Sequence, residues 1–151
     1  MRTAALGVIL FFATAVFTSG AIGLPTTQIT IETSSGSKSF AVELASDPAS
    51  QQRGLMFRRN LAPNAGMLFD FHRATSLSFW MKDTILPLDM LFIRSDGTIS
   101  TIASNTVPLS TAPIPSAEPV RAVLEINAGL ARELGIHVGD RVRATIFHDD
   151  H

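Results

Sequence analysis

Residues 28–44 read QITIETSSGSKSFAVEL, and this stretch decides the fold. Its apolar side chains alternate with polar ones on both sides of a central turn, at Ile29, Ile31, Phe40, Val42 and Leu44. A period of two is typical of strands that bury one face. Residues 34–37 place Gly36 between serines, which indicates a hairpin turn. The stretch therefore predicts two antiparallel strands.

The rest of the chain continues as short segments separated by turn signals. Further strands are expected at residues 66–71, 77–82, 89–94, 98–105, 120–126 and 141–147. In the last of these, Val142, Ala144 and Ile146 are expected to face inward. The sequence SDGT at 95–98 predicts a second hairpin turn. Four prolines within residues 107–119 predict a long extended loop.

Two short helices are expected between the strands. Asp47 followed by Pro48 has the character of an N-cap and a first turn, and the helix should reach about Met56. Asn127 is expected to cap a second helix over residues 128–134. About eight strands and two short helices predict a mostly β fold, organised as one compact domain of the β-sandwich or β-barrel kind.

The first 23 residues have the organisation of a cleavable secretory signal peptide. Arg2 supplies a positive charge, residues 4–17 form an apolar run, and small residues follow. The run is shorter than the roughly 20 residues that a spanning helix needs, so cleavage is favoured over an uncleaved anchor. The expected mature chain is residues 24–151, with its folded core at about 28–147.

Composition limits the compartment and the partners. The chain contains no cysteine, which excludes disulfides, thiolate metal ligands and a lipid attached after cleavage. We therefore expect a soluble product in the periplasm or outside the cell, with no membrane insertion after cleavage. Loss of Arg2 leaves 11 basic against 13 acidic residues, a net charge of −2. A nucleic-acid partner is not expected, because the sequence has no basic stripe.

Several distinctive motifs follow one another along the chain. They are RGLMFR at 53–58, GMLF at 66–69, SFWMKDT at 78–84, PLDMLF at 87–92, VLEIN at 123–127 and GIHVGD at 135–140. With these motifs in this order, the chain resembles the DUF192 (UPF0127) family over roughly residues 29–147. The resemblance implies a compact β-sandwich domain of jelly-roll type, without an assigned biochemical function. One departure is Asp83, where many members have Asn.

Within the SFWMKDT motif, strand alternation places Trp80 and Lys82 on the same face. Trp80 is the only tryptophan, and Lys82 is one of two lysines in a chain with ten arginines. A flat apolar ring beside a compact cation suits a ligand with an apolar or sugar face and an anionic or polar group. The alternative is structural: Trp80 covers the edge of the core while Lys82 pairs with a neighbouring carboxylate.

Two carboxylates, Asp89 and Glu125, lie inside strongly apolar runs. A carboxylate in such a place is rarely buried without a partner. Arg53 can serve as that partner, or can capture an anionic ligand with two parallel hydrogen bonds. We therefore expect Arg53, Lys82, Asp89 and Glu125 to form one network, which is either a binding site or an ion-pair lock across the sandwich.

Two other functions remain open. Asp89 or Glu125 can supply hydrolase-like acid/base chemistry if the carboxylates have the required spacing. The methionines after the first residue can bind Cu(I) in an exported protein or simply fill gaps in the core: Met56, Met67, Met81 and Met90. Among the histidines, only His148 and His151 have a paired spacing, and a terminal tail makes a weak metal site.

The sequence favours a non-enzymatic binding or accessory module for a small polar or saccharide-like ligand of the cell envelope, with neither metal nor cofactor. The cleft is expected to be lined by Arg53, Trp80, Lys82, Thr84, Asp89 and Glu125. This interpretation rests on the face formed by Trp80 and Lys82, and on a sandwich fold that often serves such binding.

Overall fold

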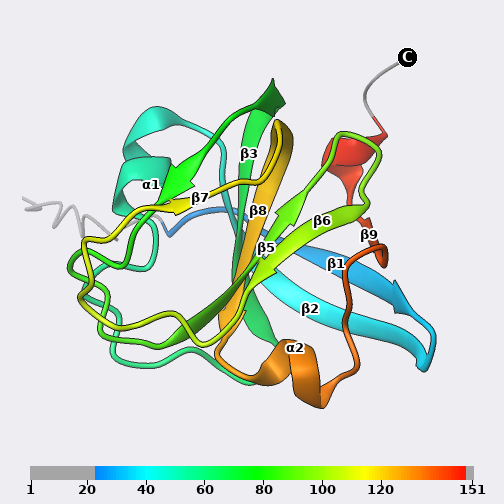
Figure 1. The fold of residues 1–151 in the computed structure, drawn as a ribbon, viewed down its shortest axis with the longest axis horizontal. Helices are drawn as coiled ribbons and strands as arrows, with labels where there is room; N and C mark the ends of the chain where they lie inside the picture. Colours follow the sequence, from blue (N-terminus) through cyan, green and yellow to red (C-terminus); the bar gives the residue numbers. More distant parts are fainter. Residues whose placement is uncertain (1–22, 149–151) are drawn as a thin grey trace, which may run out of the picture.

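A computed structural model describes residues 23–148, which form the fold drawn in Figure 1. The predicted signal peptide lies outside the described residues, apart from Gly23. The helices are α1 (Pro48–Arg53), α2 (Leu130–Glu133) and a final 3-10 turn, η1 (Thr145–Phe147). The strands are β1 (Thr26–Thr33), β2 (Gly36–Ala45), β3 (Ala65–Thr75), β4 (Ser78–Phe79), β5 (Leu88–Ile93), β6 (Ile99–Ala103), β7 (Ile114–Pro115), β8 (Val120–Asn127) and β9 (Arg141–Arg143).

Seven strands form one sheet in the order β6-β5-β8-β3-β2-β1-β9, and β4 pairs with β7 in a small second sheet. The opening hairpin is confirmed, because β1 and β2 pair antiparallel in continuous register from Thr26 opposite Glu43 to Thr33 opposite Gly36. Only the pair β2–β3 is parallel among the described strands, and its connection contains α1. The mostly β class is confirmed, and one curled sheet with a small second sheet is compatible with a sandwich.

The two edges of the large sheet meet, so that the sheet curls on itself (Figure 1). Thr98, just before β6, forms an isolated bridge with Arg141 at the start of β9. The Val142 amide donates to the Gly97 carbonyl at 2.8 Å, and the Ile99 amide donates to the Asp140 carbonyl at 2.9 Å. Gly97 is required at this junction, because its φ is 86° and a Cβ would lie 2.5 Å from the Val142 carbonyl oxygen.

Strand alternation sends buried side chains to both faces of the sheet, which creates two apolar clusters. The inner cluster fills the curled sheet and includes Ile29, Ile31, Phe40, Val42, Leu68, Leu91, Leu124, Ile126 and Val142. The outer cluster lies on the other face of the central strands and includes Leu55, Met67, Phe69, Met81, Leu88, Met90, Phe92 and Val123. The outer cluster needs a covering layer, and α1 together with the irregular segments around β4 and β7 supplies it (Figure 1).

The prediction of a strand over residues 77–82 is wrong in extent. Only β4 is strand, because the Met81 amide bonds to the Ser110 carbonyl and the Thr84 amide turns back to the Met81 carbonyl. The predicted alternation is nevertheless kept: Met81 is fully buried, whereas Trp80 and Lys82 are exposed. The segment therefore leaves the sheet ladder and runs over the outer cluster.

Three other predicted boundaries differ. Helix α1 ends at Arg53, short of Met56. Asn127 does not cap α2, because its amide donates to two carbonyls, those of Leu61 and Ala62, and Gly129 takes the N-cap position. The last predicted strand is divided into β9 and η1, although its inward-facing residues are buried as expected: Val142, Ala144 and Ile146.

Candidate functional site

A cavity of about 290 Å³ lies between the outer face of the sheet and its covering layer. Helix α1 and the residues after it contribute one side, β3 and β8 the floor, and the segment around β4 the opposite side. The lining residues are Gln51, Gln52, Arg53, Gly54, Leu55, Met56, Phe69, Phe71, Leu77, Ser78, Phe79, Trp80, Thr84 and Glu125. The cavity therefore combines an apolar wall with a small number of polar groups, as ligand sites commonly do.

The apolar wall is organised around Phe79. Its ring meets Phe69, Phe71 and Phe92 edge-on, with centroid distances of 5.2, 6.2 and 6.0 Å. Edge-to-face contacts of this kind fix ring orientation as well as burying apolar surface. The wall of the cavity is therefore held in place by several strands and does not depend on the covering segment alone.

Glu125 supplies the carboxyl group at the floor of the cavity. It lies in the middle of β8, opposite Met67 on β3 and Met90 on β5, and both methionines are fully buried. Only 5% of Glu125 is exposed, and its carboxyl group has no hydrogen bond or ion pair to any of residues 23–148. Burial raises the pKa of Glu125 to about 8, so the carboxyl group is mainly protonated at neutral pH.

Helix α1 carries polar side chains to the cavity. Asp47 caps it, because its carboxylate accepts from the Ala49 and Ser50 amides, as predicted. Arg53 lies in the last turn, and Gly54 ends the helix with a φ of 47°. A Cβ at Gly54 would lie 3.2 Å from the Phe69 ring, so this glycine permits close approach of the helix end to the wall.

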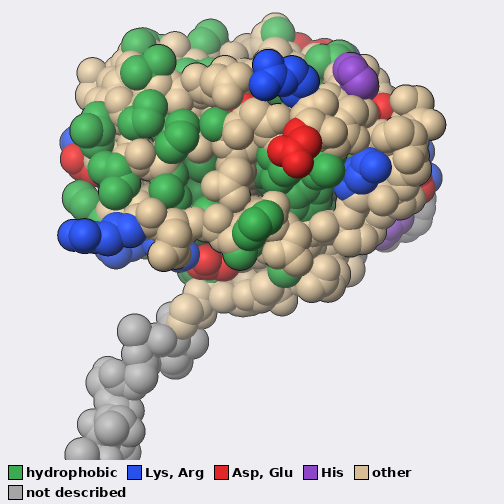
Figure 2. All heavy atoms as spheres, turned by 90° about the horizontal axis from the view of Figure 1, so that it is seen from below, with side chains coloured by type: hydrophobic (Ala, Val, Ile, Leu, Met, Phe, Trp, Pro, Cys, Tyr) green, Lys and Arg blue, Asp and Glu red, His purple; other side chains and the backbone are tan. Residues whose placement is uncertain are grey.

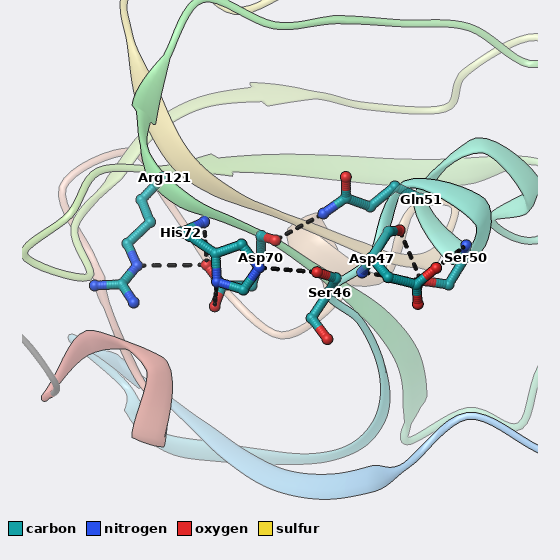
Figure 3. Close-up of polar contacts among 7 residues, drawn as sticks. All are labelled: Ser46, Asp47, Ser50, Gln51, Asp70, His72 and Arg121. Atoms are coloured by element: carbon teal, nitrogen blue, oxygen red, sulfur yellow. Dashed lines mark hydrogen bonds and ion pairs between the residues drawn. The ribbon is translucent and has the colours of Figure 1, made fainter.

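A polar network fixes α1 to the sheet (Figure 3). Gln51 donates to the Asp70 carbonyl at 2.7 Å, and the buried Asp70 carboxylate lies 3.4 Å from the Arg121 guanidinium. His72 bonds to the Ser46 carbonyl at 2.8 Å, while its own amide donates to Asp70. The network therefore joins β3 and β8 to the residue before the N-cap and to the middle of α1, and determines where the helix presents its side chains.

The mouth of the cavity continues into a shallower hollow. Gln52, Arg53, Met56 and Trp80 line both spaces, and Lys82 and Asp83 line only the outer one. The Lys82 ammonium lies 5.4 Å from the centre of the Trp80 ring, a cation–π contact. The predicted Trp80–Lys82 face therefore lies at the entrance, where it can contact a ligand that occupies the cavity.

The loops around this mouth adopt uncommon backbone conformations. Phe57, Asp83 and Leu109 have φ values of 64°, 54° and 62°, in the left-handed region that non-glycine residues seldom adopt. Backbone hydrogen bonds hold these loops together, from the Phe57 amide to the Asp83 carbonyl and from the Leu109 amide to the Thr84 carbonyl. Such strain is concentrated at functional sites in many proteins.

Large apolar side chains are also exposed on the same loops: Phe57, Trp80, Ile85, Val107 and Leu109. Figure 2 shows apolar side chains gathered on one part of the face seen from below. Exposed apolar surface near a cavity is a common property of binding regions.

The expected network of four charged residues is not formed. Within residues 23–148, no ion pair joins any two of Arg53, Lys82, Asp89 and Glu125. Glu125 pairs across the sheet with Met90, whereas the neighbouring Asp89 lies opposite Ile126. Because adjacent strand residues face opposite sides, Asp89 and Glu125 are separated by the sheet itself.

Asp89 has a structural role and does not take its predicted place in the binding site. It is fully buried, and its carboxylate accepts from the Asn105 amide at 2.8 Å and the Ala131 amide at 3.0 Å. It therefore ties β5 to the segment after β6 and to α2. Asp89 is absent from the described lining of the cavity, which contains four of the six predicted residues: Arg53, Trp80, Thr84 and Glu125.

Sequence reasoning missed the aromatic wall and the polar network beneath α1. The signal for the wall was present, since Phe69, Phe71 and Phe79 occur in or beside the distinctive motifs. Nothing in the sequence shows that Asp70 and Arg121, which are 51 positions apart, would be adjacent. Likewise, Gln52 lies in a helix too short to show a clear polar face.

The fold and the site define a small mostly β domain that holds a ligand-sized cavity between a curled sheet and its covering layer. The chain belongs to the DUF192 family, described as "Uncharacterized ACR", whose model matches residues 29–144. No curated protein matches the chain.

Two solved structures are similar to the chain. A crystal structure from Sinorhizobium meliloti 1021, described as a candidate transcription regulator, is 49% identical with a TM-score of 0.82, covering 84% of this chain and 99% of that one. A protein of unknown function from Novosphingobium aromaticivorans DSM 12444 is 43% identical with a TM-score of 0.80, covering 82% and 89%.

Proposed function

We propose that this protein is an exported, non-enzymatic binding or accessory module that holds a small polar or saccharide-like ligand in the cell envelope. One observation carries the proposal: the Glu125 carboxyl group lines the cavity without a partner among residues 23–148. No fully buried side-chain oxygen or nitrogen in the described chain lacks a hydrogen-bond partner, so the Glu125 oxygens open onto the cavity and are not enclosed by protein. A ligand in the cavity can therefore bond directly to this carboxyl group.

The size and chemistry of the cavity support a small ligand. A volume of about 290 Å³ is close to the lower end of common ligand pockets. The Phe79 and Trp80 rings offer surfaces on which a sugar or another ring can lie, and Gln52 and Arg53 offer hydrogen-bond donors beside them.

The hydrolase alternative is now restricted to Glu125. Two-carboxylate glycoside hydrolysis requires both carboxyl groups beside the substrate, and Asp89 faces the other side of the sheet. The raised pKa of Glu125 suits a proton donor, so acid catalysis by this residue alone is the second candidate. Screening with glycan and ester substrates distinguishes it, because a binding module leaves every substrate intact.

The copper alternative receives less support from the positions of the methionines. Met67, Met81 and Met90 are fully buried in the outer apolar cluster. The Thr106 hydroxyl donates to the Met81 sulfur at 3.2 Å, so one thioether already has a partner. This arrangement favours the core-filling interpretation.

The description of the Sinorhizobium relative suggests a nucleic-acid function, which we do not propose for this chain. Nucleic-acid binding depends on clustered basic side chains, and the chain has a net charge of −1. Several arginines are paired with carboxylates in the structure, namely Arg58, Arg94, Arg141 and Arg143.

Export rests on the sequence of the first 23 residues. The structure adds that no helix among residues 23–148 is long and apolar enough to cross a membrane.

The binding proposal is tested by a thermal-shift screen of the purified, naturally processed protein against saccharides, sugar acids and small aromatic compounds. We expect at least one compound to raise the melting temperature, and Trp80→Ala to abolish that increase because it removes the ring at the entrance. Lys38→Ala, at the only other lysine, serves as the matched control for Lys82→Ala. If no compound binds, the binding function is wrong. If Trp80→Ala and Lys82→Ala bind as well as the unmodified protein, the site is misplaced.

A further inference from the structure

The charged side chains around the cavity differ between its entrance and its floor. Arg53 and Lys82 are exposed at the entrance, and neither has an ion-pair partner among residues 23–148. A few residues away, by contrast, Arg58 forms a two-pronged ion pair with Glu43 at 2.7 and 2.8 Å. Asp83 is the one carboxylate that lines the described outer hollow. Within the described chain, the entrance therefore offers an incoming anion two cations that have no ion-pair partner.

The floor of the cavity, in contrast to the entrance, presents a carboxyl group in apolar surroundings. Glu125 is flanked by the apolar side chains of Met67 on β3 and Met90 on β5. From the covering layer, Arg53 is the one charged residue among the described lining, and it does not lower the pKa of Glu125. The protonated carboxyl group at neutral pH is thus a neutral hydrogen-bond donor that also keeps one acceptor oxygen.

Between the entrance and the floor, the wall is formed by rings. Phe79 is fixed by its edge-on contacts, and Trp80 is held at the entrance beneath the Lys82 ammonium. A flat ring can therefore lie along the wall with one end at the cations and the other at Glu125. A cationic ligand is disfavoured twice, because it must pass two like charges and has no anion at the floor.

We propose that the pocket selects a monoanion built on a ring, with its anionic group at Arg53 and Lys82 and an acceptor oxygen on the Glu125 carboxyl proton. This inference rests on the proposed binding function and names its ligand class. A sugar acid and an aromatic carboxylic acid share this chemistry. In the sugar acid a ring hydroxyl accepts from Glu125, and in the aromatic acid a carbonyl substituent does so.

The test compares ligands that share a ring and differ in the charge of one substituent. One set consists of glucuronate, glucose and glucosamine; the other consists of 4-acetylbenzoate, 4-acetylbenzyl alcohol and 4-acetylbenzylamine. Dissociation constants are measured at pH 6.5 from Trp80 fluorescence and by calorimetry. We expect the anion of one set to bind at least tenfold more tightly than its neutral and cationic counterparts, and the set that binds identifies the source.

Substitutions test which residues produce the preference for the anionic ligand. Lys82→Gln and Arg53→Gln should each reduce the anion preference at least threefold, while Lys38→Gln leaves it unchanged. Affinity of the unmodified protein for the anion should fall at least fivefold between pH 6.5 and 9.0, because Glu125 loses the proton that it donates. Glu125→Gln retains an N–H donor, and should therefore bind at pH 6.5 and lose this pH dependence.

The failures of the two proposals are distinguishable. If a neutral or cationic compound binds as tightly as the anion, or if Glu125→Gln keeps the full pH dependence, the ligand class is wrong and the binding function stands. If no compound in either set or in the wider screen binds, both proposals fail.

Discussion

At the scale of the residue, Glu125 combines burial with the lack of a partner among residues 23–148. Its position on β8 follows from strand alternation, which sends it to the same face as Val123 and to the opposite face from Leu124 and Ile126. The side chains around Glu125 come from the neighbouring strands, with Met67 on β3 and Met90 on β5. Within the described chain the carboxyl group makes no hydrogen bond, and it opens onto the cavity.

The raised pKa of Glu125 predicts a pH-dependent stability. In the unfolded chain this group has its ordinary pKa near 4.5, and in the folded protein about 8. Below about pH 4.5 both states hold the proton. As the pH rises further, the unfolded state loses the proton first, so the free energy of unfolding decreases until about pH 8 and then levels off. The loss is on the order of a few kcal/mol.

This prediction is checked by chemical denaturation between pH 5 and 9, with Glu125→Gln as the matched variant. We expect the variant to be less sensitive to pH over this range than the unmodified protein, because its amide does not ionise. Equal slopes for the two proteins would show that the carboxyl group titrates near its ordinary value.

At the scale of the element, two buried aspartates contact segments that the strand ladders do not join. Asp70 lies beneath α1, where its carbonyl accepts from Gln51 (Figure 3). Asp89 occupies a similar role at α2, where its two oxygens accept from the Asn105 and Ala131 amides. Each aspartate therefore orients a short helix that is unstable by itself, Asp70 through its backbone carbonyl and Asp89 through its carboxylate.

Replacement of Asp89 by alanine should destabilise the fold by about 2–5 kcal/mol, because it leaves two backbone amides without their acceptor. Asp89→Asn keeps one acceptor oxygen and should lose less. Urea denaturation measures both. Ligand binding by Asp89→Asn should be unchanged at a temperature where the variant is folded; a selective loss of affinity would return Asp89 to the site.

At the scale of the whole molecule, closure of the sheet separates two interiors. The junction of Gly97 with Val142 joins the edges and seals the inner cluster. The outer cluster is covered by short, irregular segments, and the cavity lies between this layer and the sheet. A closed sheet therefore supplies the rigid support, while the covering layer supplies most of the residues that can contact a ligand.

Export makes a prediction about the mature protein. When the whole chain is produced in a bacterium with a secretory system, we expect most of it outside the cytoplasm and beginning at Leu24, as measured by fractionation and intact mass. Replacement of Ala21 and Gly23 by bulky residues should block this processing, because signal cleavage requires small side chains. A full-length product that stays in the cytoplasm would contradict export.

Local patterns in the sequence were sufficient to predict much of the fold. The alternation of residues 28–44 predicted the opening hairpin, and Asp47 with Pro48 predicted the start of α1. Four of six expected site residues line the described cavity. Such features depend on the period of the side chains and on nearby backbone groups, and both are determined by residues that are close in the sequence.

The sequence by itself determined the β class, the hairpin, the helix start and the exposure of Trp80 and Lys82. Only the tertiary structure decided that Asp89 and Glu125 lie on opposite sides of one sheet, and that Glu125 meets Met67 and Met90. The physical reason is that strand register across β3, β8 and β5 sets which distant residues become neighbours. The charged residues of the sequence suggested an ion-pair network. The strand register instead places Asp89 and Glu125 on opposite faces of the sheet, and the Glu125 carboxyl group faces the cavity.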